Sequence, residues 1–568
     1  MLVFYRNKLD RIISASFSRR SKEAIPEWLE KNTKSPLDIQ KPWSFIDHEY
    51  QRFLLTIDKP QVTIRKCSQV GVSELASRLC LACSVVFPAS TSIYILPSTS
   101  YARKFVSTRI DTTVKASKTL SESLSGDVDN LELKQFGSSF IFFVGAAKQQ
   151  QAISIPARAL FRDEVDFCDQ SVLSSFESRL GHNVPGEEMK YSFSTPTVDN
   201  YGISELFNEG TQHYYFVYHD RCSQWVQIDY IFAVRVPGFD GSLLDFERGD
   251  LDIYDINNSY IECPNCNKDF SLQNLADPAR RAWVPKYRGR DHASFQVFPS
   301  DLPVINPPSK VLKSIKNYRL KKDWINFSIG LPYQDAHSSV LIEAVQKYRI
   351  IVSSVSSAAV LGMDVGKVCH ITIGVNRRRN MGGGGGGRGR NSELDIIWKE
   401  RCKDVDAVER VKKLFKQFNI LKAVIDAQPD HTVAREIIET SLDGQVWACY
   451  YLRKAPDKLS YYKLDKIEQI VSPARTAVID EVVEGLNCGD IRDCKREEEI
   501  SDKHFSAMKR INKFDEVGGD KAVWINTGED HYFHSLVYCW VAKDLAEEGV
   551  GTVFSVVPKV SKVRVKAG

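Results

Sequence analysis

The stretch VTIRKCSQVGVSELASRLC, residues 62–80, decides how the first half of the chain folds. An apolar, strand-like run (VTI) leads into a turn that contains a glycine, and a helix-like run (ELASRLC) follows directly. Backbone N–H groups and the start of a helix face the same point in such a turn, which is where a phosphate-binding loop belongs. Taken alone, the stretch is equally compatible with an ordinary strand–turn–helix that holds an incidental Gly and Ser.

The loop departs from the standard phosphate-binding pattern GxxxxGK[ST]. Gly71 and Ser73 are present, but Val72 stands where the lysine is expected. Lys66, at the start of the loop, would reach the β- and γ-phosphates of a nucleotide in its place. Ser73 would then bind Mg²⁺.

A second run supports this interpretation. PARALFRDEVDF (156–167) is an apolar strand that ends in Asp163 and Glu164. Asp163 would hold the water shell of Mg²⁺ and Glu164 would activate the attacking water, as in a P-loop ATPase. YSFSTPT (191–197) is another strand that ends in small hydroxyl residues, which would sense the γ-phosphate. Gln51, in FIDHEYQRF, lies where a glutamine that recognises adenine would lie; a Gln on a helix surface is the alternative.

Three acidic positions follow in the last part of the chain. Asp364 lies in AAVLGMDVGK, Asp426 in LKAVIDAQPD and Asp530 in NTGEDHYFHS. The first two end apolar, strand-like runs, and the third opens a helix-like run. Three carboxylates arranged in this way hold two divalent metals, Mg²⁺ or Mn²⁺, for in-line cleavage of a phosphodiester. Their order matches an RNase H-like nuclease, although each Asp alone is also a common strand-end residue. Auxiliary groups would be His531, His534 and Asp430.

Two short motifs suggest a zinc site. HDRC supplies His219 and Cys222, and CPNC supplies Cys263 and Cys266. Two pairs of N/S ligands, each separated by two residues, suit tetrahedral Zn²⁺. The loop between the pairs is longer than in a usual zinc ribbon, so a reduced turn beside a surface histidine remains the alternative.

The expected fold class is α/β, with a P-loop ATPase domain on a parallel sheet, followed by an RNase H-like nuclease domain. The expected order is a basic, Ser-rich arm (1–40), the ATPase domain (41–285), a linker or small subdomain (286–345) and the nuclease domain with a basic tail (346–568). A Cys-bearing insert is expected at about 213–270. The Gly-rich run 381–391 is expected at a flexible hairpin tip.

Composition limits the class of protein. A chain of 568 residues is too long for one core, and its 43% hydrophobic and 26% charged residues are ordinary for a soluble globular protein. The net charge of +4 means that nucleic-acid binding depends on local basic patches. There is no secretion signal and no membrane-length apolar run, so we expect a cytosolic protein whose 13 cysteines are mostly free thiols.

The ordered series of motifs resembles the large terminase subunit of tailed bacteriophages, in its lambda-like branch. The series comprises HEYQ, the loop with the displaced lysine, YILPS, RALFRDEVD, FSTPT, the Cys-bearing insert and FSIGLPY. The resemblance covers most of residues 40–545 and is specific as a series. It implies that the first half drives double-stranded DNA into a procapsid at the expense of ATP. The ATPase roles fall to Lys66, Gly71, Ser73, Asp163 and Glu164, and the second half would cut concatemeric DNA.

The resemblance also implies partners: the concatemeric viral genome, a small terminase subunit and the portal protein. The chain would assemble on the portal as a homo-oligomer in the cytoplasm of the bacterial host. One departure concerns the arginine that many terminases carry inside the loop, where this chain has Ser68 and Gln69. Arg65, Arg158 or a neighbouring subunit would have to supply it.

Two other interpretations remain open. The first is a helicase-like ATPase fused to an RNase H-like nuclease of repair or recombination. The second is a DNA-binding assembly scaffold that no longer hydrolyses ATP. Val72 favours the scaffold, whereas the retained pair of Asp163 and Glu164 argues against it.

Overall fold

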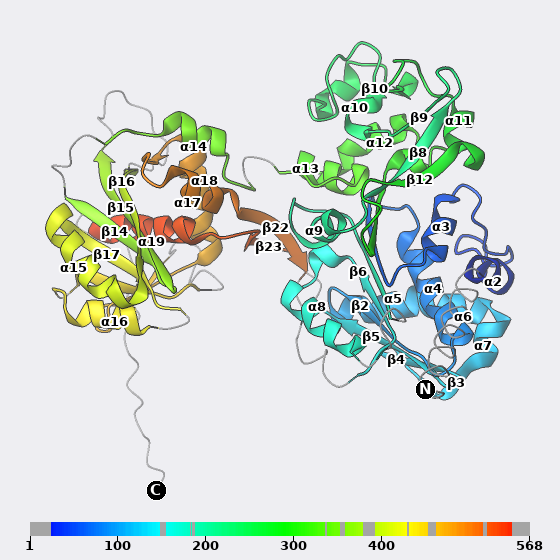
Figure 1. The fold of residues 1–568 in the computed structure, drawn as a ribbon, viewed down its shortest axis with the longest axis horizontal. Coiled ribbons are helices and arrows are strands. Elements are labelled where there is room, and N and C mark those ends of the chain that lie inside the picture. The colour runs from blue at the N-terminus through cyan, green and yellow to red at the C-terminus, as the bar shows by residue number, and fades with distance from the viewer. Residues whose placement is uncertain are drawn as a thin grey trace, which may run out of the picture. The chain divides into compact units, whose positions relative to one another are not determined.

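The computed structural model describes residues 24–147, 155–181, 183, 188–334, 338–352, 358–378, 392–428, 431–442, 444–452, 462–514 and 520–547. Two units are present: Met1–Tyr333 with Asn512–Lys521, and Gln334–Ile511 with Ala522–Gly568 (Figure 1). The Gly-rich run, the C-terminal tail and Asp430 lie outside the described residues. None of the described helices is both long and apolar enough to cross a membrane.

The first unit is built on an 11-stranded sheet. Its order is β12-β8-β13-β1-β7-β6-β2-β5-β4-β3, with β9 beside β8. The strands are β1 (Gln61–Lys66), β2 (Thr91–Leu96), β3 (Leu124–Asp129), β4 (Leu133–Phe136), β5 (Ser139–Gly145), β6 (Ala159–Asp163), β7 (Met189–Ser194), β8 (His213–His219), β9 (Gln224–Val226), β12 (Arg281–Pro285) and β13 (His292–Val297). The strands from β13 to β5 pair in parallel, so the predicted parallel α/β sheet is confirmed.

Both faces of this sheet are buried, which explains why its central strands are apolar almost throughout. In β2, Tyr94 and Leu96 belong to the same core as α4, whereas Ile93 and Ile95 belong to a separate core with α8. The helices around the sheet are α2 (Ile25–Asn32), α3 (Tyr50–Thr56), α4 (Val72–Val86), α5 (Thr99–Phe105), α6 (Asp111–Ala116), α7 (Lys118–Ser123), α8 (Gln170–Glu177) and α9 (Gly202–Glu209), with a π-helix, η1 (Val106–Ile110), between α5 and α6.

The prediction that residues 1–40 form an arm outside the folded domain is wrong from Ile25 onward. Ile25 and Leu29 of α2 are buried in the same core as α4, so residues from Ile25 onward belong to the folded unit. The basic composition of the region conceals this, because only one face of the helix is apolar. Residues 1–23 lie outside the described ranges.

Two further boundaries differ from the expectation. The insert begins after β8, since this strand pairs with β12 and β13 in the main sheet. It contains α10 (Tyr230–Ala233), β10 (Val234–Arg235), β11 (Tyr260–Ile261) and α11 (Leu272–Ala276). The predicted linker of 286–345 contains β13, a direct neighbour of β1. It also contains α12 (Pro308–Lys313), α13 (Lys321–Trp324) and the π-helix η10 (Ile325–Ile329), whose apolar residues share a core with the insert.

The second unit has an eight-stranded sheet in the order β19-β20-β18-β17-β14-β15-β16-β21. The strands are β14 (Ala359–Asp364), β15 (Val368–Arg378), β16 (Ser392–Lys403), β17 (Ile420–Asp426), β18 (Val446–Cys449), β19 (Tyr462–Asp465), β20 (Ile470–Pro473) and β21 (Ile491–Arg492). Two further strands, β22 (Met508–Phe514) and β23 (Asp520–Asn526), form a two-stranded sheet of their own, and the part of it within Asn512–Lys521 belongs to the first unit. The predicted antiparallel meander of the first three strands is confirmed, and β17 runs parallel to β14.

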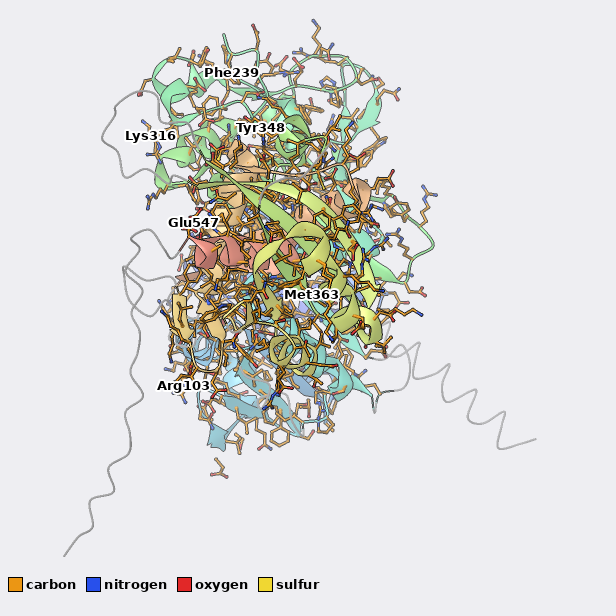
Figure 2. The ribbon with its side chains drawn as sticks, turned by 90° about the vertical axis from the view of Figure 1, so that its left-hand side faces the viewer. Arg103, Phe239, Lys316, Tyr348, Met363 and Glu547 are labelled. Atoms are coloured by element: carbon orange, nitrogen blue, oxygen red, sulfur yellow. The ribbon has the colours of Figure 1, made fainter. Side chains whose placement is uncertain are left out.

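Five helices belong to this part of the chain: α14 (Ile342–Tyr348), α15 (Ala407–Phe418), α16 (Thr432–Glu439), α17 (Arg475–Cys488) and α18 (Glu498–Ser506). A further helix, α19 (His531–Ala546), packs against β14, β15 and β17. Met363 of β14 and Glu547, at the end of α19, are labelled in Figure 2. This packing brings a late segment of the sequence onto the strands that carry the first two predicted carboxylates.

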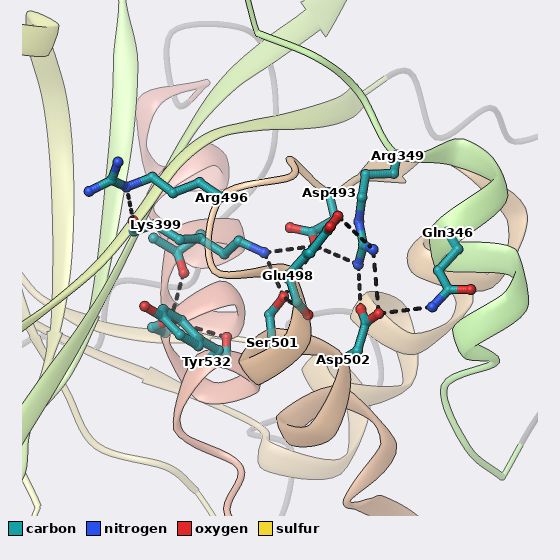
Figure 3. Close-up of polar contacts among 11 residues, drawn as sticks. Gln346, Arg349, Lys399, Asp493, Arg496, Glu498, Ser501, Asp502 and Tyr532 are labelled. Carbon is teal, nitrogen blue, oxygen red and sulfur yellow. Dashed lines mark hydrogen bonds and ion pairs between the residues drawn. The ribbon is translucent and has the colours of Figure 1, made fainter.

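A buried ionic network joins β16 to the helices beside it (Figure 3). Lys399 and Asp493 are both fully buried, and their Nζ and Oδ2 atoms are 2.7 Å apart. Lys399 Nζ also donates to Ser501 Oγ at 2.6 Å. Arg349 approaches Asp493 Oδ2 at 3.1 Å and pairs with Asp502 as well. Buried charges require partners of this kind, because desolvation of an unpaired ion costs several kcal/mol.

Candidate functional sites

The predicted phosphate-binding loop connects β1 to the first turn of α4. Gly71 precedes the helix with φ +80°, and a Cβ there would come within 2.9 Å of Gln51 Nε2, so glycine is required at this position. Val72 is 1% exposed and its side chain belongs to the core. It therefore offers only its backbone N–H to an anion, and a lysine there would have to leave the core.

The residues expected to act on the nucleotide meet at this loop. Lys66 Nζ is 3.3 Å from Glu164 Oε1. Ser73 Oγ donates to Asp163 Oδ1 at 3.1 Å, and the hydroxyl of Tyr94 donates to the other oxygen of Asp163 at 3.1 Å. A lysine, a hydroxyl and two carboxylates from three separate segments thus form one cluster at the ends of β1 and β6.

The electrostatics of this cluster favour a cation. Burial, and then the neighbouring charge of Glu164, raise the pKa of Asp163 to about 7, while Lys66 opposes the rise. Glu164 has φ +53°, an uncommon conformation for a residue other than glycine that is often found at functional sites. A divalent cation would relieve the repulsion between the two carboxylates.

Asp166 was missed by the sequence analysis, although it is the last acid of RDEVD. Its carboxylate accepts hydrogen bonds of 2.7 Å from the backbone N–H and the hydroxyl of Thr197, and from the backbone N–H of Ile203. Burial raises its pKa to about 7. Asp166 therefore ties the strand that carries Asp163 to the end of the FSTPT segment.

The FSIGLPY segment, expected in a linker, contacts the loop directly. The backbone N–H of Ser68 donates to the carbonyl of Phe327 at 2.7 Å. Gly330 has φ +83°, and a Cβ there would lie 2.4 Å from the backbone nitrogen of Cys67. The backbone N–H of Tyr333, at the end of the segment, donates to the carbonyl of Thr197 at 3.3 Å, and Asn326 Nδ2, directly before the segment, donates to the same carbonyl at 3.0 Å. The segment thus touches both the phosphate loop and the FSTPT strand end.

Gln51 is fully buried, which excludes the helix-surface alternative. Its Nε2 atom donates to the hydroxyl of Tyr50 and to the carbonyl of Val70, both at 3.2 Å. Its Oε1 atom is buried and has no partner among the described residues. The side chain therefore lies against the loop, and its Oε1 atom is an unused hydrogen-bond acceptor there.

The two arginines proposed to replace a loop arginine are engaged elsewhere. The guanidinium of Arg65 lies 4.1 Å from the ring centroid of Phe207, and that of Arg158 lies 4.7 Å from the ring of Phe87. Arg109, in η1, was not singled out from the sequence. Its Nε atom is 3.8 Å from Glu74 Oε2, its side chain is 42% exposed, and its charge, together with that of Lys66, opposes the rise in the pKa of Asp163.

In the second unit, Asp364 ends β14 and Asp426 ends the adjacent parallel strand β17. Met363 is paired in register with Ile425, so Asp364 and Asp426, the next residue of each strand, lie side by side at the same edge of the sheet. Asp530 is the N-cap residue of α19. A Cβ on Gly362 would lie 2.1 Å from backbone atoms of α19, so this glycine permits the helix to approach β14 closely.

Two histidines of α19 each contact one of these carboxylates through a ring nitrogen. His531 Nδ1 is 2.9 Å from Asp364 Oδ2, and His534 Nε2 is 3.3 Å from Asp530 Oδ2. Burial, and then the charge of Asp364, raise the pKa of Asp426 to about 6. Burial also acts to raise the pKa of Asp530, but the hydrogen bond and charge of His534 hold it below its usual value.

Two further histidines, which no sequence motif indicated, lie beside these carboxylates. His370 faces Asp364 across the antiparallel pair of β14 and β15, and its ring stacks on His531 with centroids 4.8 Å apart. The ring of His504 lies 5.8 Å from that of His531. Ligand atoms of Asp364, His370 and His531 all lie within 4.8 Å of one another, a spacing that a metal ion can bridge. In the described chain this group does not include Asp426 or Asp530.

The predicted zinc ligands also come together. His219, Cys222, Cys263 and Cys266 each place one ligand atom within 4.8 Å of the others.

These features define the class of fold: a P-loop ATPase-type α/β unit, followed along the chain by an α/β unit with the RNase H-like strand arrangement. Residues 49–282 match the family described as "Phage terminase large subunit gpA, ATPase domain". This match confirms, for this part of the chain, the resemblance to phage terminase large subunits that was drawn from the motifs.

Solved structures similar to this chain include three from bacteriophages. The HK97 large terminase is 9% identical, with 91% of this chain and 98% of that chain covered and a TM-score of 0.47. The large terminase of a thermophilic bacteriophage is 11% identical, with 85% and 93% covered and a TM-score of 0.30. The ATPase domain of a Thermus phage large terminase is 12% identical, with 52% and 96% covered and a TM-score of 0.31. No curated protein matches the chain.

Proposed function

We propose that this protein is the large subunit of a phage terminase, which hydrolyses ATP to move double-stranded DNA into a procapsid and cuts the concatemeric genome in a metal-dependent reaction. The observation that carries the proposal is the cluster of Lys66, Ser73, Asp163 and Glu164 at the loop. It supplies a cation, a hydroxyl and two carboxylates at the N-terminus of a 15-residue helix.

In the ATPase reaction, the backbone N–H groups at the start of α4 bind the phosphates. Ser73 and Asp163 would hold Mg²⁺, which supplies positive charge to the phosphate oxygens. Lys66 and Glu164 neutralise each other while the site is free of nucleotide. A γ-phosphate draws Lys66 toward itself and releases Glu164, which then accepts a proton from the attacking water. The displaced lysine thus couples nucleotide binding to the activation of the base.

Coupling to DNA movement would pass through residues 325–333. This segment contacts the loop through Phe327 and the FSTPT strand end through Asn326. The chain continues from Tyr333 into the second unit at Gln334. A change in the loop on hydrolysis would therefore reach the connection between the two units through a few hydrogen bonds.

Hydrolysis of ATP by the purified chain, with and without linear duplex DNA, tests the motor. We expect Lys66→Ala to lower the rate at least tenfold, because the positive charge of Lys66 stabilises the transition state. Lys59→Ala is the matched control, because Lys59 lies near the surface and pairs with the exposed Asp291. Equal rates for wild type and Lys66→Ala would overturn the proposed role of the lysine.

The two other interpretations give different results in the same assay. A scaffold would hydrolyse no ATP even with the small subunit and portal protein present. A helicase-like enzyme would unwind forked DNA, whereas a terminase moves along intact duplex. Retention of Lys66, Asp163 and Glu164 in one cluster supports an active ATPase over the scaffold.

For the nuclease, Asp364, Asp426 and the imidazoles of His370 and His531 are the proposed ligands of Mg²⁺ or Mn²⁺. Asp530, held by His534, would complete a second metal position in a two-metal mechanism. The test is cleavage of plasmid DNA with Mn²⁺ by wild type and Asp364→Ala, with Asp465→Ala, at a strand end elsewhere in this sheet, as control. Undiminished cutting by Asp364→Ala would refute the assignment.

The remaining parts of the proposal rest on the family. The protein would act in the cytoplasm of the bacterial host, as a homo-oligomer on the portal, with a small terminase subunit that delivers the DNA. Gln51, whose free acceptor lies beside the loop, would bind the exocyclic amine of adenine. Pull-down with the portal protein in the presence of a non-hydrolysable ATP analogue tests this assembly.

A further inference from the structure

The four residues of the His/Cys cluster come from the end of β8 and from two turns of the insert. His219 is the last residue of β8, and Cys222 lies in the turn that leads to β9. Cys263 and Cys266 follow β11, and Cys263 lies 41 residues after Cys222 in the sequence. His219 and Cys263 are fully buried.

The distances between these atoms are those of a tetrahedral metal site. His219 Nδ1 is 3.4 Å from the sulfur of Cys222 and 3.4 Å from that of Cys266, and the sulfurs of Cys222 and Cys263 are 3.9 Å apart. Bonds of about 2.3 Å to sulfur and about 2.0 Å to nitrogen, at tetrahedral angles, place two sulfurs about 3.8 Å apart and a nitrogen about 3.5 Å from a sulfur.

The same distances argue against a disulfide, in which the sulfurs would be about 2 Å apart. The CPNC turn is already folded as a metal-binding knuckle. Backbone N–H groups of Asn265 and Cys266 point at the sulfur of Cys263. Asn267 follows with φ +54°, which closes the turn. The turn therefore has its shape without a covalent bond between the cysteines.

We propose that His219, Cys222, Cys263 and Cys266 bind one structural Zn²⁺ ion that fastens the insert to the sheet of the ATPase unit. Four protein ligands fill the tetrahedral shell, so no position remains for a substrate or water and the ion has no catalytic role. The proposal concerns the stability of the insert and is independent of ATP hydrolysis and DNA cleavage.

The ion would act together with two surface ion pairs at the same place. Arg221 pairs with Asp269 at 2.8 Å, and Arg280 pairs with Asp220 at 3.1 Å. Such exposed pairs contribute little, about 0–1 kcal/mol each, so they cannot by themselves hold the ends of a long insert together. β8 lies beside β13, which lies beside β1. Zinc at the end of β8 therefore fixes the insert two strands away from the phosphate loop.

The test is the metal content of the full-length chain, purified without a metal-binding tag. We expect about one zinc per chain in the wild type and in Cys488→Ser, the control, because Cys488 is exposed and lies outside the cluster. Cys222→Ser and Cys263→Ser should lose the zinc. Protein produced with cobalt in place of zinc should show the intense thiolate-to-cobalt absorption of a tetrahedral site, and both variants should lack it.

If the variants fail to fold, titration of the wild type with a mercurial reagent replaces them. Zinc should then appear in solution in proportion to the cysteines modified, and protease should cut within residues 220–280 as zinc leaves. A reduced, folded wild type that takes up neither zinc nor cobalt would overturn the proposal. So would a native mass showing a disulfide between Cys222 and Cys263, or full metal content in a chain that carries both serine substitutions.

Discussion

Replacing Lys399 by methionine should strongly destabilise the second unit. Methionine matches the length of the lysine stem but leaves Asp493, which is fully buried, without its nearest cation. The Oδ1 atom of Asp493 already lacks a partner among the described residues. Removing one member of a buried ion pair typically costs about 3–5 kcal/mol, because the other charge stays desolvated.

The structure places the expected value at the lower end of that range. Arg349 remains 3.1 Å from Asp493 Oδ2, but it also forms ion pairs with Asp502 and Glu498. We therefore expect a loss of about 3 kcal/mol in the free energy of opening of β16 and α18. Since about 1.4 kcal/mol corresponds to a factor of ten, backbone amides there should exchange more than about 100-fold faster.

Hydrogen exchange of the full-length chain, followed by mass spectrometry, measures this directly, and peptides of the first unit serve as an internal reference. Arg435→Ala is the matched control, because it breaks an exposed helical pair with Glu439 and should cost under about 1 kcal/mol. Combining Lys399→Met with Asp493→Leu should recover part of the loss. Unchanged exchange in Lys399→Met, or an effect no larger than that of Arg435→Ala, would refute the reasoning.

Three further predictions concern the first unit. Gly330→Ala should lower ATP hydrolysis at least tenfold, because its Cβ would clash with the backbone of Cys67 at 2.4 Å; Gly289→Ala, with open space around it, should have no effect. Arg109→Ala should lower the turnover rate more than ATP binding, whereas Arg103→Ala, which breaks an exposed pair with Glu132, should change neither. Burial lowers the pKa of His213 and of His292 from 6.5 to about 4. Between these two pH values the histidines are therefore neutral in the folded state and protonated in the unfolded state. Stability from these two groups is fully present above pH 6.5 and lost as the pH falls toward 4; the melting temperature should fall less steeply over this range when both are replaced by glutamine.

The sequence by itself determined the elements whose signals are local. The alternation of apolar runs and helix-like stretches predicted the strands β1, β2, β5, β6 and β7, and the three strand ends that carry Asp163, Asp364 and Asp426 followed from it. These predictions succeed because a buried parallel strand needs a continuous apolar run, and a residue at its carboxyl end is fixed by position alone. The order of the motifs then identified the family.

Only the tertiary structure decided which distant residues meet. His370 faces Asp364 because of the register between β14 and β15, and His504 joins them through the packing of α18 against α19. Phe327 contacts Ser68 across a separation that no periodicity encodes. Register and close packing depend on complementary surfaces formed after the chain has folded, such as Gly362 beneath α19. The local sequence pattern therefore located the carboxylates along the chain, whereas tertiary packing determined which histidines and loop residues surround them.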